Sequence, residues 1–354
     1  MNISSSIRKP GSYTTIKIGA TNRLPSTRQE MVIVGQRLSS GTLAKNIPKA
    51  ISGPEQAATY WGAGSIMHRM AMAAFKQHPY IIVSGCAVDD AAAGVAATAT
   101  ITFAGAATGV GIASLLIGND QVSIAISDEM TPAQAATALA AEIAKYPDLP
   151  VTATAEAAVV TMTAKNKGTV GNLIGRYNAT SEKHEPEITV TAPGLTTTVV
   201  GFTGGEGDPA DADVSAAYAA LASKRYHLYA IAWTSADAAE LLSDHLESVS
   251  DEINQRPARG YMFLSSALAD VTTVSAVNAR RLVVGYIRGC RRPSYENAAA
   301  EAAMQAASET PWRALNNTEL VGCDSPSTQD CLTFNEINNL LWSGVTPFEV
   351  GAGS

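Results

Sequence analysis

Four short stretches contain residues of the kind that carry chemistry. In the first, Gly62-Ala63-Gly64-Ser65, glycines precede an apolar periodic run, as in loops that bind phosphate at a helix N-terminus. Such a loop needs a strand leading directly into the glycines, whereas the residues before Gly62 have a helical pattern. The stretch also lacks a G-K-[ST] ending and a third glycine. We therefore predict a corner between two helices and no nucleotide site.

The second and third stretches offer a catalytic pair and a cluster of carboxylates. Asp244 and His245 with a distant serine would suit nucleophilic catalysis, but adjacent helix residues point about 100° apart, so Asp244 is badly placed to orient the ring. Asp208, Asp211 and Asp213 would suit calcium, yet their spacing departs from the calcium-loop pattern. We interpret His245 as a partly buried helix residue and the aspartates as a solvated linker with an Asp cap.

The fourth stretch, YIRGCRRPSYE, places Arg288, Arg291 and Arg292 just past a predicted strand, where α/β sheets bind ligands. Three guanidinium groups suit an anion, and they equally suit carboxylates of a neighbouring subunit. We favour the subunit contact because no base or nucleophile accompanies them. The chain has no H-E-x-x-H, G-x-S-x-G, C-x-x-C or Walker pattern, so we predict no catalytic, cofactor-binding or metal-binding residue.

The composition limits the class of protein. The 354 residues are 46% hydrophobic and 16% charged, which suffices for a sizeable core. A net charge of -7 argues against a nucleic-acid partner. Without a signal-peptide pattern or an apolar run of about 18 residues, we predict neither export by a leader nor membrane insertion. We expect Cys86, Cys290, Cys323 and Cys331 to be reduced, with a Cys323–Cys331 bridge as the alternative.

Two separated regions alternate strand and helix patterns. The first contains apolar strands at 31–36 and 80–85, and the second contains them at 226–233, 261–265 and 281–287. Strands that alternate with helices imply crossover connections and a parallel sheet. Since both regions share this pattern, we predict that they form one α/β core domain with a mostly parallel sheet.

Capping patterns predict where the helices of this core begin. Ser52-Gly53-Pro54-Glu55 has the form of a capping box for a short helix that runs to about Trp61, and Ser65 caps the next helix. The outward face of this second helix is expected to carry His68, Arg69 and Lys76. A long helix starts at 234–237. Its sheet-facing residues are expected to be Ala238, Leu242, His245 or Leu246, Val249 and Ile253.

The residues between the two regions have a different composition, rich in Ala, Thr, Val and Gly. Alternating patterns predict half-buried strands at 98–105 and 121–127, and 117–121 has hairpin chemistry. Thr131 and Gln134 form a capping box for a helix, and a further hairpin follows at 151–164. We interpret residues 89–207 as a small, β-rich α+β domain inserted into the core.

The predicted organisation therefore has three parts. These are an extended N-terminal arm at 1–20, a discontinuous core at 21–88 and 208–354, and the inserted domain at 89–207. In the arm, one segment reads as a strand: Tyr13, Thr14, Thr15, Ile16, Lys17 and Ile18. An isolated strand needs a partner sheet, and a neighbouring subunit's sheet edge can supply it. Donation that does not close into a ring propagates into a helical array.

The chain resembles the tail sheath proteins of contractile, Mu-like bacteriophages, which are related to the sheaths of phage-derived bacteriocins. The resemblance begins with RKPGSYTTIKIGATNRLPSTRQEMVIVGQRLSSGT and continues in YWGAGSIMHRMAMAAF. The segment LPVTATAEAAVVTMTAKNKGTVGN resembles the inserted domain of these proteins, and TPWRALNN and TFNEINNLLWSGVTPFEV resemble later core segments. The match covers essentially the whole chain. Each motif is short, but their order and spacing together are specific.

The resemblance implies a structural protein and not an enzyme. Sheath subunits of this family stack as hexameric rings around a tail tube and contract, which drives the tube through the bacterial envelope. The implied partners are other copies of the chain, the tail tube protein, the baseplate and the tail terminator. The implied location is the virion tail, after assembly in the host bacterial cytoplasm. Arg288, Arg291 and Arg292 become candidates for subunit or tube contacts.

The chain departs from these sheath proteins in its length, and two functions other than a tail sheath stay open. Sheath proteins of this type usually continue well past GVTPFEV, so we expect the core to be incomplete at the C-terminus and assembly to be impaired. The first alternative is an α/β enzyme or small-ligand-binding protein that uses the Arg288–Arg292 loop. The second is an adhesive accessory domain, in which the Thr- and Ala-rich insert binds glycans.

Overall fold

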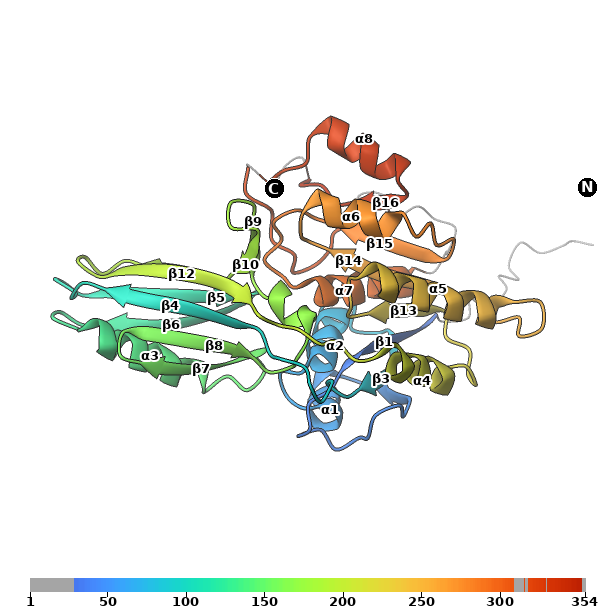
Figure 1. The fold of residues 1–354 in the computed structure, drawn as a ribbon, viewed down its shortest axis with the longest axis horizontal. Coiled ribbons are helices and arrows are strands. Elements are labelled where there is room, and N and C mark those ends of the chain that lie inside the picture. The colour runs from blue at the N-terminus through green and yellow to red at the C-terminus, as the bar shows by residue number, and fades with distance from the viewer. Residues whose placement is uncertain (1–28, 309–314, 316–317, 329, 352–354) are drawn as a thin grey trace, which may run out of the picture.

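A layered α/β body and a β-rich projection make up the computed structural model (Figure 1). The structure describes residues 29–308, 315, 318–328 and 330–351. The predicted arm at 1–20, including Tyr13–Ile18, lies outside the described residues, so that expectation stays a prediction. Most of the TPWRALNN segment is also outside them.

A seven-stranded sheet forms the centre of the body, in the order β16-β15-β14-β13-β1-β3-β2. All neighbouring pairs are parallel except β2 with β3, which agrees with the mostly parallel sheet expected from the sequence. The strands are β1 (Glu30–Gln36), β2 (Lys49–Ile51), β3 (Ile82–Val88), β13 (Leu228–Ile231), β14 (Arg259–Leu264), β15 (Leu282–Tyr286) and β16 (Val345–Pro347). Strand β1 is central and almost wholly buried, because helices cover both faces of the sheet.

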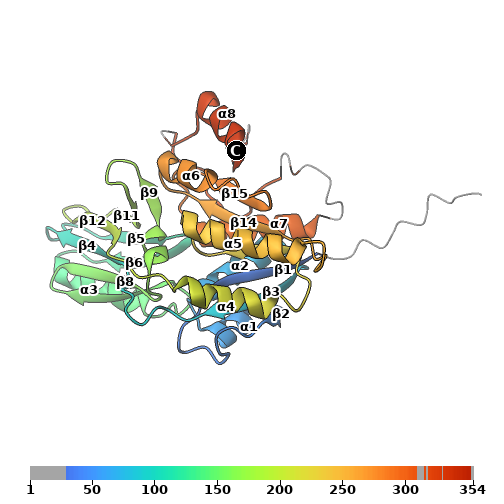
Figure 2. The ribbon, with the colours of Figure 1, turned by 45° about the vertical axis from the view of Figure 1, so that its right-hand side comes forward.

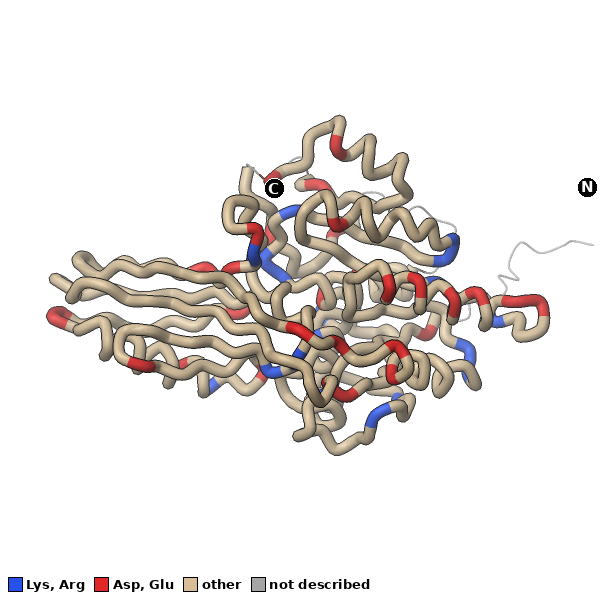
Figure 3. The backbone as a smooth tube through the Cα atoms, viewed as in Figure 1, with Lys and Arg blue, Asp and Glu red and all other residues tan. Residues whose placement is uncertain are grey.

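Helices cover the two faces of this sheet. They are α1 (Pro54–Trp61), α2 (Ile66–Gln77), α4 (Asp211–Leu221), α5 (Ala236–Ser250), α6 (Leu268–Ser275), α7 (Ser294–Ala307) and α8 (Phe334–Trp342). Helices α4 and α5 lie on one face and α2 and α7 on the other (Figure 2). Acidic residues recur along α5, whose backbone is coloured red at several places in Figure 3. Four exposed ones are spaced three or four residues apart: Asp237, Glu240, Asp244 and Glu247. Among helices of the described residues, none has the length and apolar character that crossing a membrane requires.

Helix α7 is enclosed between the sheet and α2. Its residues from Ser294 to Gln305 are all buried, and alanines make up much of this run. Small side chains let two helices approach closely, which explains why α2 and α7 share the largest contact between any two elements. On the other side of α2, the fully buried Trp61 ring lies over Gly85 of β3, where a Cβ would collide with it.

The projection contains two antiparallel sheets and has its own hydrophobic core. One sheet has six strands in the order β7-β8-β4-β12-β10-β9, and the other has the order β11-β5-β6. The elements are β4 (Thr98–Ala104), β5 (Gly111–Ile117), β6 (Asp120–Ile126), α3 (Pro132–Ile143), β7 (Val151–Glu156), β8 (Val159–Ala164), the 3-10 helix η1 (Thr169–Leu173), β9 (Arg176–Asn178), β10 (Lys183–Glu185), β11 (Glu187–Val190) and β12 (Thr196–Thr203). Its buried residues form a separate cluster. The boundaries 89–207 as a domain stay a prediction.

Several predicted helix caps are confirmed. Ser65 accepts a hydrogen bond from the His68 N–H, and Ser235 caps α5 in the same way. Thr131 and Gln134 form both hydrogen bonds of the expected capping box. Side chains that receive the first free N–H groups of a helix set its start, which explains why these boundaries follow the sequence.

Two local predictions are wrong. The residue that caps α1 is Gly53, without a side-chain hydrogen bond, and Gln56 rather than Glu55 reaches back to accept from the Ser52 N–H at 3.0 Å. Because Pro54 is the first helical residue, Ser52 lies one position too early to cap. Ile253 is 90% exposed, since Asp251 ends α5 by accepting the N–H of Ile253.

Candidate functional site at the junction of body and projection

The carboxyl ends of β1, β3 and β15 face the projection, at the edge where α/β sheets bind ligands. We call this region the junction. It consists of residues of the body, of the connection that follows β3, and of the projection. The body contributes Gln36, Arg37, Arg69 and Arg288–Arg292, the connection contributes Asp89 and Asp90, and the projection contributes Asp120, Asn166, Lys167 and Glu187. Figure 3 colours Lys and Arg blue, and several blue segments of the backbone lie where the body and the projection meet.

A hydrogen-bonded network fills the edge at the ends of β1 and β3. The buried Gln36 side chain donates to Asp90 Oδ1 and to the Lys167 carbonyl, each at 2.8 Å. Asn166 Nδ2 donates to the same Asp90 oxygen at 2.9 Å, and the Lys167 N–H donates to the other at 3.0 Å. Burial raises the pKa of Asp90, while the hydrogen bonds from Asn166, Lys167 and Gln36 oppose that rise. A segment of the projection therefore occupies the position of a ligand.

The Gly62–Ser65 stretch is a corner between α1 and α2, as predicted. Its N–H groups already have acceptors: Gly64 donates to His68 Nδ1 at 3.0 Å, and Ile66 donates to Asn166 Oδ1 at 3.0 Å. Burial lowers the pKa of His68, which favours the neutral ring that can accept this hydrogen bond. A phosphate at this corner would have to displace protein acceptors from both N–H groups.

Arg69 is buried at the junction, contrary to the expectation that it lies on the outward face of α2. The residue is 3% exposed, and His68 is equally buried. Its Nε lies 2.8 Å from Glu296 Oε1 and its Nη1 lies 2.5 Å from Asp120 Oδ2. The prediction failed because α7 and the β5–β6 turn cover the side of α2 that would otherwise be exposed. Burial lowers the pKa of Arg69, and the two carboxylates more than offset this, so the pKa rises overall.

The three arginines after β15 each bind groups of the same chain. Arg288 forms a bidentate ion pair with Glu336, in which Nη1 donates to Oε1 at 2.9 Å and Nη2 donates to Oε2 at 3.1 Å. Arg291 pairs with Glu187 of the projection at 2.8 Å and with Asp324 at 2.5 Å. Arg292 is nearly unexposed and donates to Asn297 Oδ1 and to the Val321 carbonyl, at 2.5 and 2.7 Å. The predicted contact with another subunit or with a tail tube stays a prediction, and these internal partners do not test it.

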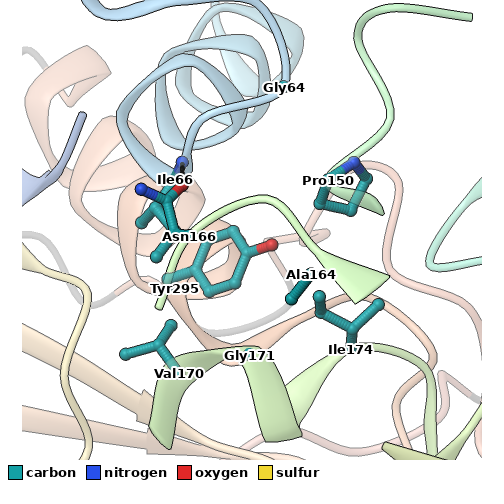
Figure 4. Close-up of a pocket in the computed structure, with 9 residues that line it drawn as sticks. All are labelled: Gly64, Ile66, Pro150, Ala164, Asn166, Val170, Gly171, Ile174 and Tyr295. Carbon is teal, nitrogen blue, oxygen red and sulfur yellow. Dashed lines mark hydrogen bonds between the residues drawn. The ribbon is translucent and has the colours of Figure 1, made fainter. Parts of the chain in front are cut away.

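A small cavity lies inside the junction, between Gly64, Pro150, Ile174 and Tyr295 (Figure 4). Its volume of about 10 Å³ has room for one water molecule and excludes an organic ligand. The Tyr295 hydroxyl is buried and lacks a hydrogen-bond partner within the described part of the chain. Burial raises the pKa of this hydroxyl, so it stays protonated.

The other candidate residues lie apart from the junction. His245 stacks on Tyr218 with ring centroids 4.9 Å apart, and burial lowers its pKa to about 4, which fits the predicted partly buried helix residue. Asp208 accepts from the N–H and the hydroxyl of Thr169, the first residue of η1, at 2.7 and 2.6 Å. Asp213 pairs with Lys45. The described residues contain no group of three or more possible metal ligands.

Glu301 is a further buried carboxyl that sequence reasoning did not single out. It lies on α7, is 3% exposed, and its Oε2 has no hydrogen-bond partner among the described residues. Gly285 of β15 leaves the space that this carboxyl occupies. Burial raises the pKa of Glu301 to about 8 from an ordinary value of 4.5.

Replacing Glu301 with glutamine is expected to change how stability depends on pH. Because the folded pKa lies above the unfolded one, the folded state binds the proton more tightly from about pH 4.5 to 8, and the free energy of unfolding falls as pH rises. We expect the wild type to lose stability relative to Glu301→Gln across this window, by at most about 1.4 kcal/mol per pH unit. Urea denaturation at several pH values measures this difference.

The matched control for this series is Glu336→Gln. Hydrogen bonds from Arg288 and Thr333 lower the pKa of Glu336 to about 2. The free energy of unfolding of the wild type should therefore exceed that of Glu336→Gln above pH 4.5, and this difference should shrink as pH falls. Parallel pH profiles for the wild type and Glu301→Gln would contradict the assignment of a buried, neutral carboxyl.

Comparison with known proteins finds similarity to a tail sheath protein along the whole chain. No family model matches the chain. The chain is 28% identical over 359 aligned residues to the tail sheath protein of the Mu-like prophage FluMu of Haemophilus influenzae, which covers 100% of this chain and 72% of the relative. The resemblance to Mu-like tail sheath proteins is confirmed. Because the similarity to the FluMu sheath protein spans the whole chain, it includes the body, the projection and the junction between them.

Two solved structures of sheath tail proteins are also similar to this chain. The protein from Desulfitobacterium hafniense aligns with a TM-score of 0.48 at 13% identity, over 96% of this chain and 72% of that one. The protein from Listeria innocua aligns with a TM-score of 0.44 at 13% identity, over 92% of this chain and 66% of that one.

Sequence reasoning missed the residues that hold the junction together. Arg69, Asp90, Asn166 and Glu296 have no spacing that distinguishes them from surface residues. The available signal was an arginine within the Ala- and Met-rich helix after Gly62–Ser65, where the apolar residues around it indicated burial on several sides.

Proposed function

We propose that the chain is a structural, non-enzymatic subunit of a contractile phage tail sheath. The observation that carries this proposal is the 28% identity to the FluMu tail sheath protein along the whole chain. In the proposed role, copies stack as hexameric rings around a tail tube, and contraction drives the tube through the bacterial envelope. The proposed partners are other copies, the tube protein, the baseplate and the tail terminator, in a virion tail assembled in the host cytoplasm.

The geometry of the junction supports a structural role over a small-ligand-binding one. At the sheet edge where a ligand would bind, Gln36 of the body donates to Asp90 and to the Lys167 carbonyl, and Asp90 also accepts from Asn166 and Lys167 of the projection. The guanidinium groups that would attract an anion are paired with protein carboxylates, as Arg291 is with Glu187. Charges that are already paired gain little from a second anion, which argues against the alternative that uses the Arg288–Arg292 loop.

The proposed organisation keeps the three predicted parts. We propose residues 1–20 as an arm whose segment Tyr13–Ile18 pairs with the sheet edge of a neighbouring copy. The boundaries 89–207 for an inserted domain are supported by β3 ending at Val88 and by α4 beginning at Asp211. An arm that reaches across subunits would stay paired while the rigid bodies rotate, as a contracting lattice requires.

We also propose that Arg288 and Arg291 contribute to a contact with a neighbouring subunit or with the tube. Their side chains keep 17% and 18% of their surface exposed, so a neighbouring chain can reach both. Arg292 is 1% exposed, and we propose that it acts indirectly by holding the shape of the loop.

Deleting residues 1–18 is expected to abolish assembly while the fold is kept. The experiment is electron microscopy of the purified chain, co-expressed with a tail tube protein of a Mu-like phage. The intact chain should form rings, tubes or decorated tail tubes, whereas the shortened chain should give dispersed particles with an unchanged circular dichroism spectrum, because it lacks the proposed donated strand.

A shorter deletion of residues 1–9 is the control, since it leaves Pro10 to Ile18 and should preserve assembly. If the chain without residues 1–18 assembled as well as the intact chain, the proposed role of the arm in assembly would be wrong. Dispersed particles from both chains would match the impaired assembly expected from the sequence, whereas failure of the intact chain to bind the tube at all would argue against the sheath role itself.

A further inference from the structure

Two cysteines that neither the fold nor the proposed function explains lie in direct contact beside the junction. The Sγ atoms of Cys290 and Cys323 are 2.8 Å apart, although the residues are 33 positions apart in the sequence. Cys290 is fully buried in the loop between β15 and α7, and Cys323 is partly exposed on the segment that leads towards α8. Both are free thiols, and the contact replaces the Cys323–Cys331 pairing considered from the sequence.

The surroundings hold the two sulfur atoms in place from both sides. Arg291 pairs with Asp324 at 2.5 Å, and Arg292 donates to the Val321 carbonyl at 2.7 Å, so the loop of Cys290 binds the residues on both sides of Cys323. A disulfide bond is about 2.05 Å long, so the sulfur atoms need to approach by less than about 1 Å. A bond between them therefore requires no rearrangement of the chain.

The local charges favour a thiolate at Cys290. The hydrogen bond from Cys323 lowers the pKa of Cys290 to about 7, with further contributions from the Arg292 guanidinium and from Asn297, and burial opposes them. Asn297 Nδ2 lies 3.5 Å from Cys290 Sγ, within reach of a sulfur acceptor. A thiolate is the nucleophile in disulfide exchange, so this sulfur is prepared to attack its neighbour.

We propose that Cys290 and Cys323 are a modification site that forms an intrachain disulfide by exchange with a low-molecular-weight disulfide. The Cys290 thiolate takes the proton of the Cys323 thiol, and the more exposed Cys323 sulfur attacks one sulfur of the small disulfide, whose S–S bond breaks. This gives a mixed disulfide at Cys323 and a small thiolate, which takes the proton from Cys290 and leaves as a thiol. The Cys290 thiolate then attacks Cys323 Sγ, which forms the intrachain bond and releases the second small thiol. The two protons of the protein thiols end on the two small thiols. The small disulfide is reduced by two electrons and the cysteine pair is oxidised.

The bond would join the loop before α7 to the segment before α8. Closing a loop of this length restricts the unfolded chain, so the oxidised protein should melt about 5 °C higher than the reduced protein. The inference does not depend on the proposed sheath function, because it rests on the two thiols and their immediate neighbours alone.

The test is incubation of the full chain with oxidised glutathione under native conditions, followed by mass spectrometry without reduction. We expect loss of two hydrogen masses from the intact chain and a peptide that links Cys290 to Cys323. Cys290→Ser should instead keep one glutathione on Cys323, because the attacking thiolate is missing. Cys323→Ser should form no intrachain bond and provides a second variant at a less buried position.

Cys331→Ser is the matched control, since Cys331 is the exposed cysteine and its removal should leave the Cys290–Cys323 bond unaffected. A linked peptide that contains Cys331 or Cys86, or a wild-type chain that carries only glutathione at single cysteines, would overturn the proposal. Retention of all four free thiols after incubation would overturn it as well.

Discussion

Replacing Arg69 with methionine is expected to lower the free energy of unfolding by about 3–5 kcal/mol, measured by urea denaturation. Arg69 is the buried cation between Glu296 of α7 and Asp120 at the start of β6. Methionine fills a similar volume, so the loss comes mainly from a buried carboxylate at Glu296 that no longer has its partner. The expected effect is large because water cannot reach Glu296 to replace the lost ion pair.

Two further variants separate this electrostatic cause from a packing defect. The double variant Arg69→Met/Glu296→Gln removes the unpaired charge and should be more stable than Arg69→Met alone. Lys145→Ala breaks an exposed ion pair with Glu142 and should change stability little, because water replaces the partner there. If Arg69→Met costs no more than Lys145→Ala, or if the second substitution restores nothing, the buried ion pair does not stabilise the junction.

Trp61→Ala is expected to destabilise the body by about 3–5 kcal/mol. Trp61 is fully buried, and its ring lies in the space that Gly85 of β3 leaves by having no Cβ. Alanine would leave a cavity between α1, α2 and the sheet, which the surrounding strands cannot close. Denaturant unfolding followed by circular dichroism measures the loss, and Trp342→Ala, at an exposed position of α8, is the control with a small expected effect.

A double-mutant cycle tests the contact between Trp61 and Gly85 directly. Gly85→Ala alone should cost about 1–3 kcal/mol, because its Cβ meets the far end of the indole ring. In a Trp61→Phe background the shorter ring makes room, so the same substitution should cost less. Additive effects of the two substitutions would show that the glycine is not required by the tryptophan.

Both predictions concern how firmly the parts of one subunit are held together. In the proposed sheath, subunits rotate as rigid bodies, so the junction must resist the forces between neighbours. Arg69 connects α2, α7 and the start of β6, and Arg291 adds a second ion pair between the body and the projection through Glu187. We therefore expect Arg69→Met to weaken assembly as well as stability.

The sequence by itself determined many of the elements and the resemblance to tail sheath proteins. Local signals were sufficient where a structure depends on neighbouring residues: the Thr131 and Gln134 capping box, the Ser65 cap and the alternating strands of the projection all formed as predicted. The capping box at Ser52 failed because Ser–x–x–Glu is also compatible with a helix that begins one residue later. The resemblance to Mu-like tail sheath proteins needed only the order of short motifs along the chain.

Only the tertiary structure decided which of these residues meet. Arg69 and Glu296 are 227 positions apart, and Ile66 and Asn166 are 100 apart, so their contacts depend on how the sheet orders its strands and where the projection folds back. A charged residue on one helix has no local property that distinguishes a solvent-facing position from a buried ion pair. The contact between Cys290 and Cys323 could not be predicted for the same reason. Residues 33 positions apart can lie at any distance, and only the arrangement of the parallel sheet and α7 brings these two segments together.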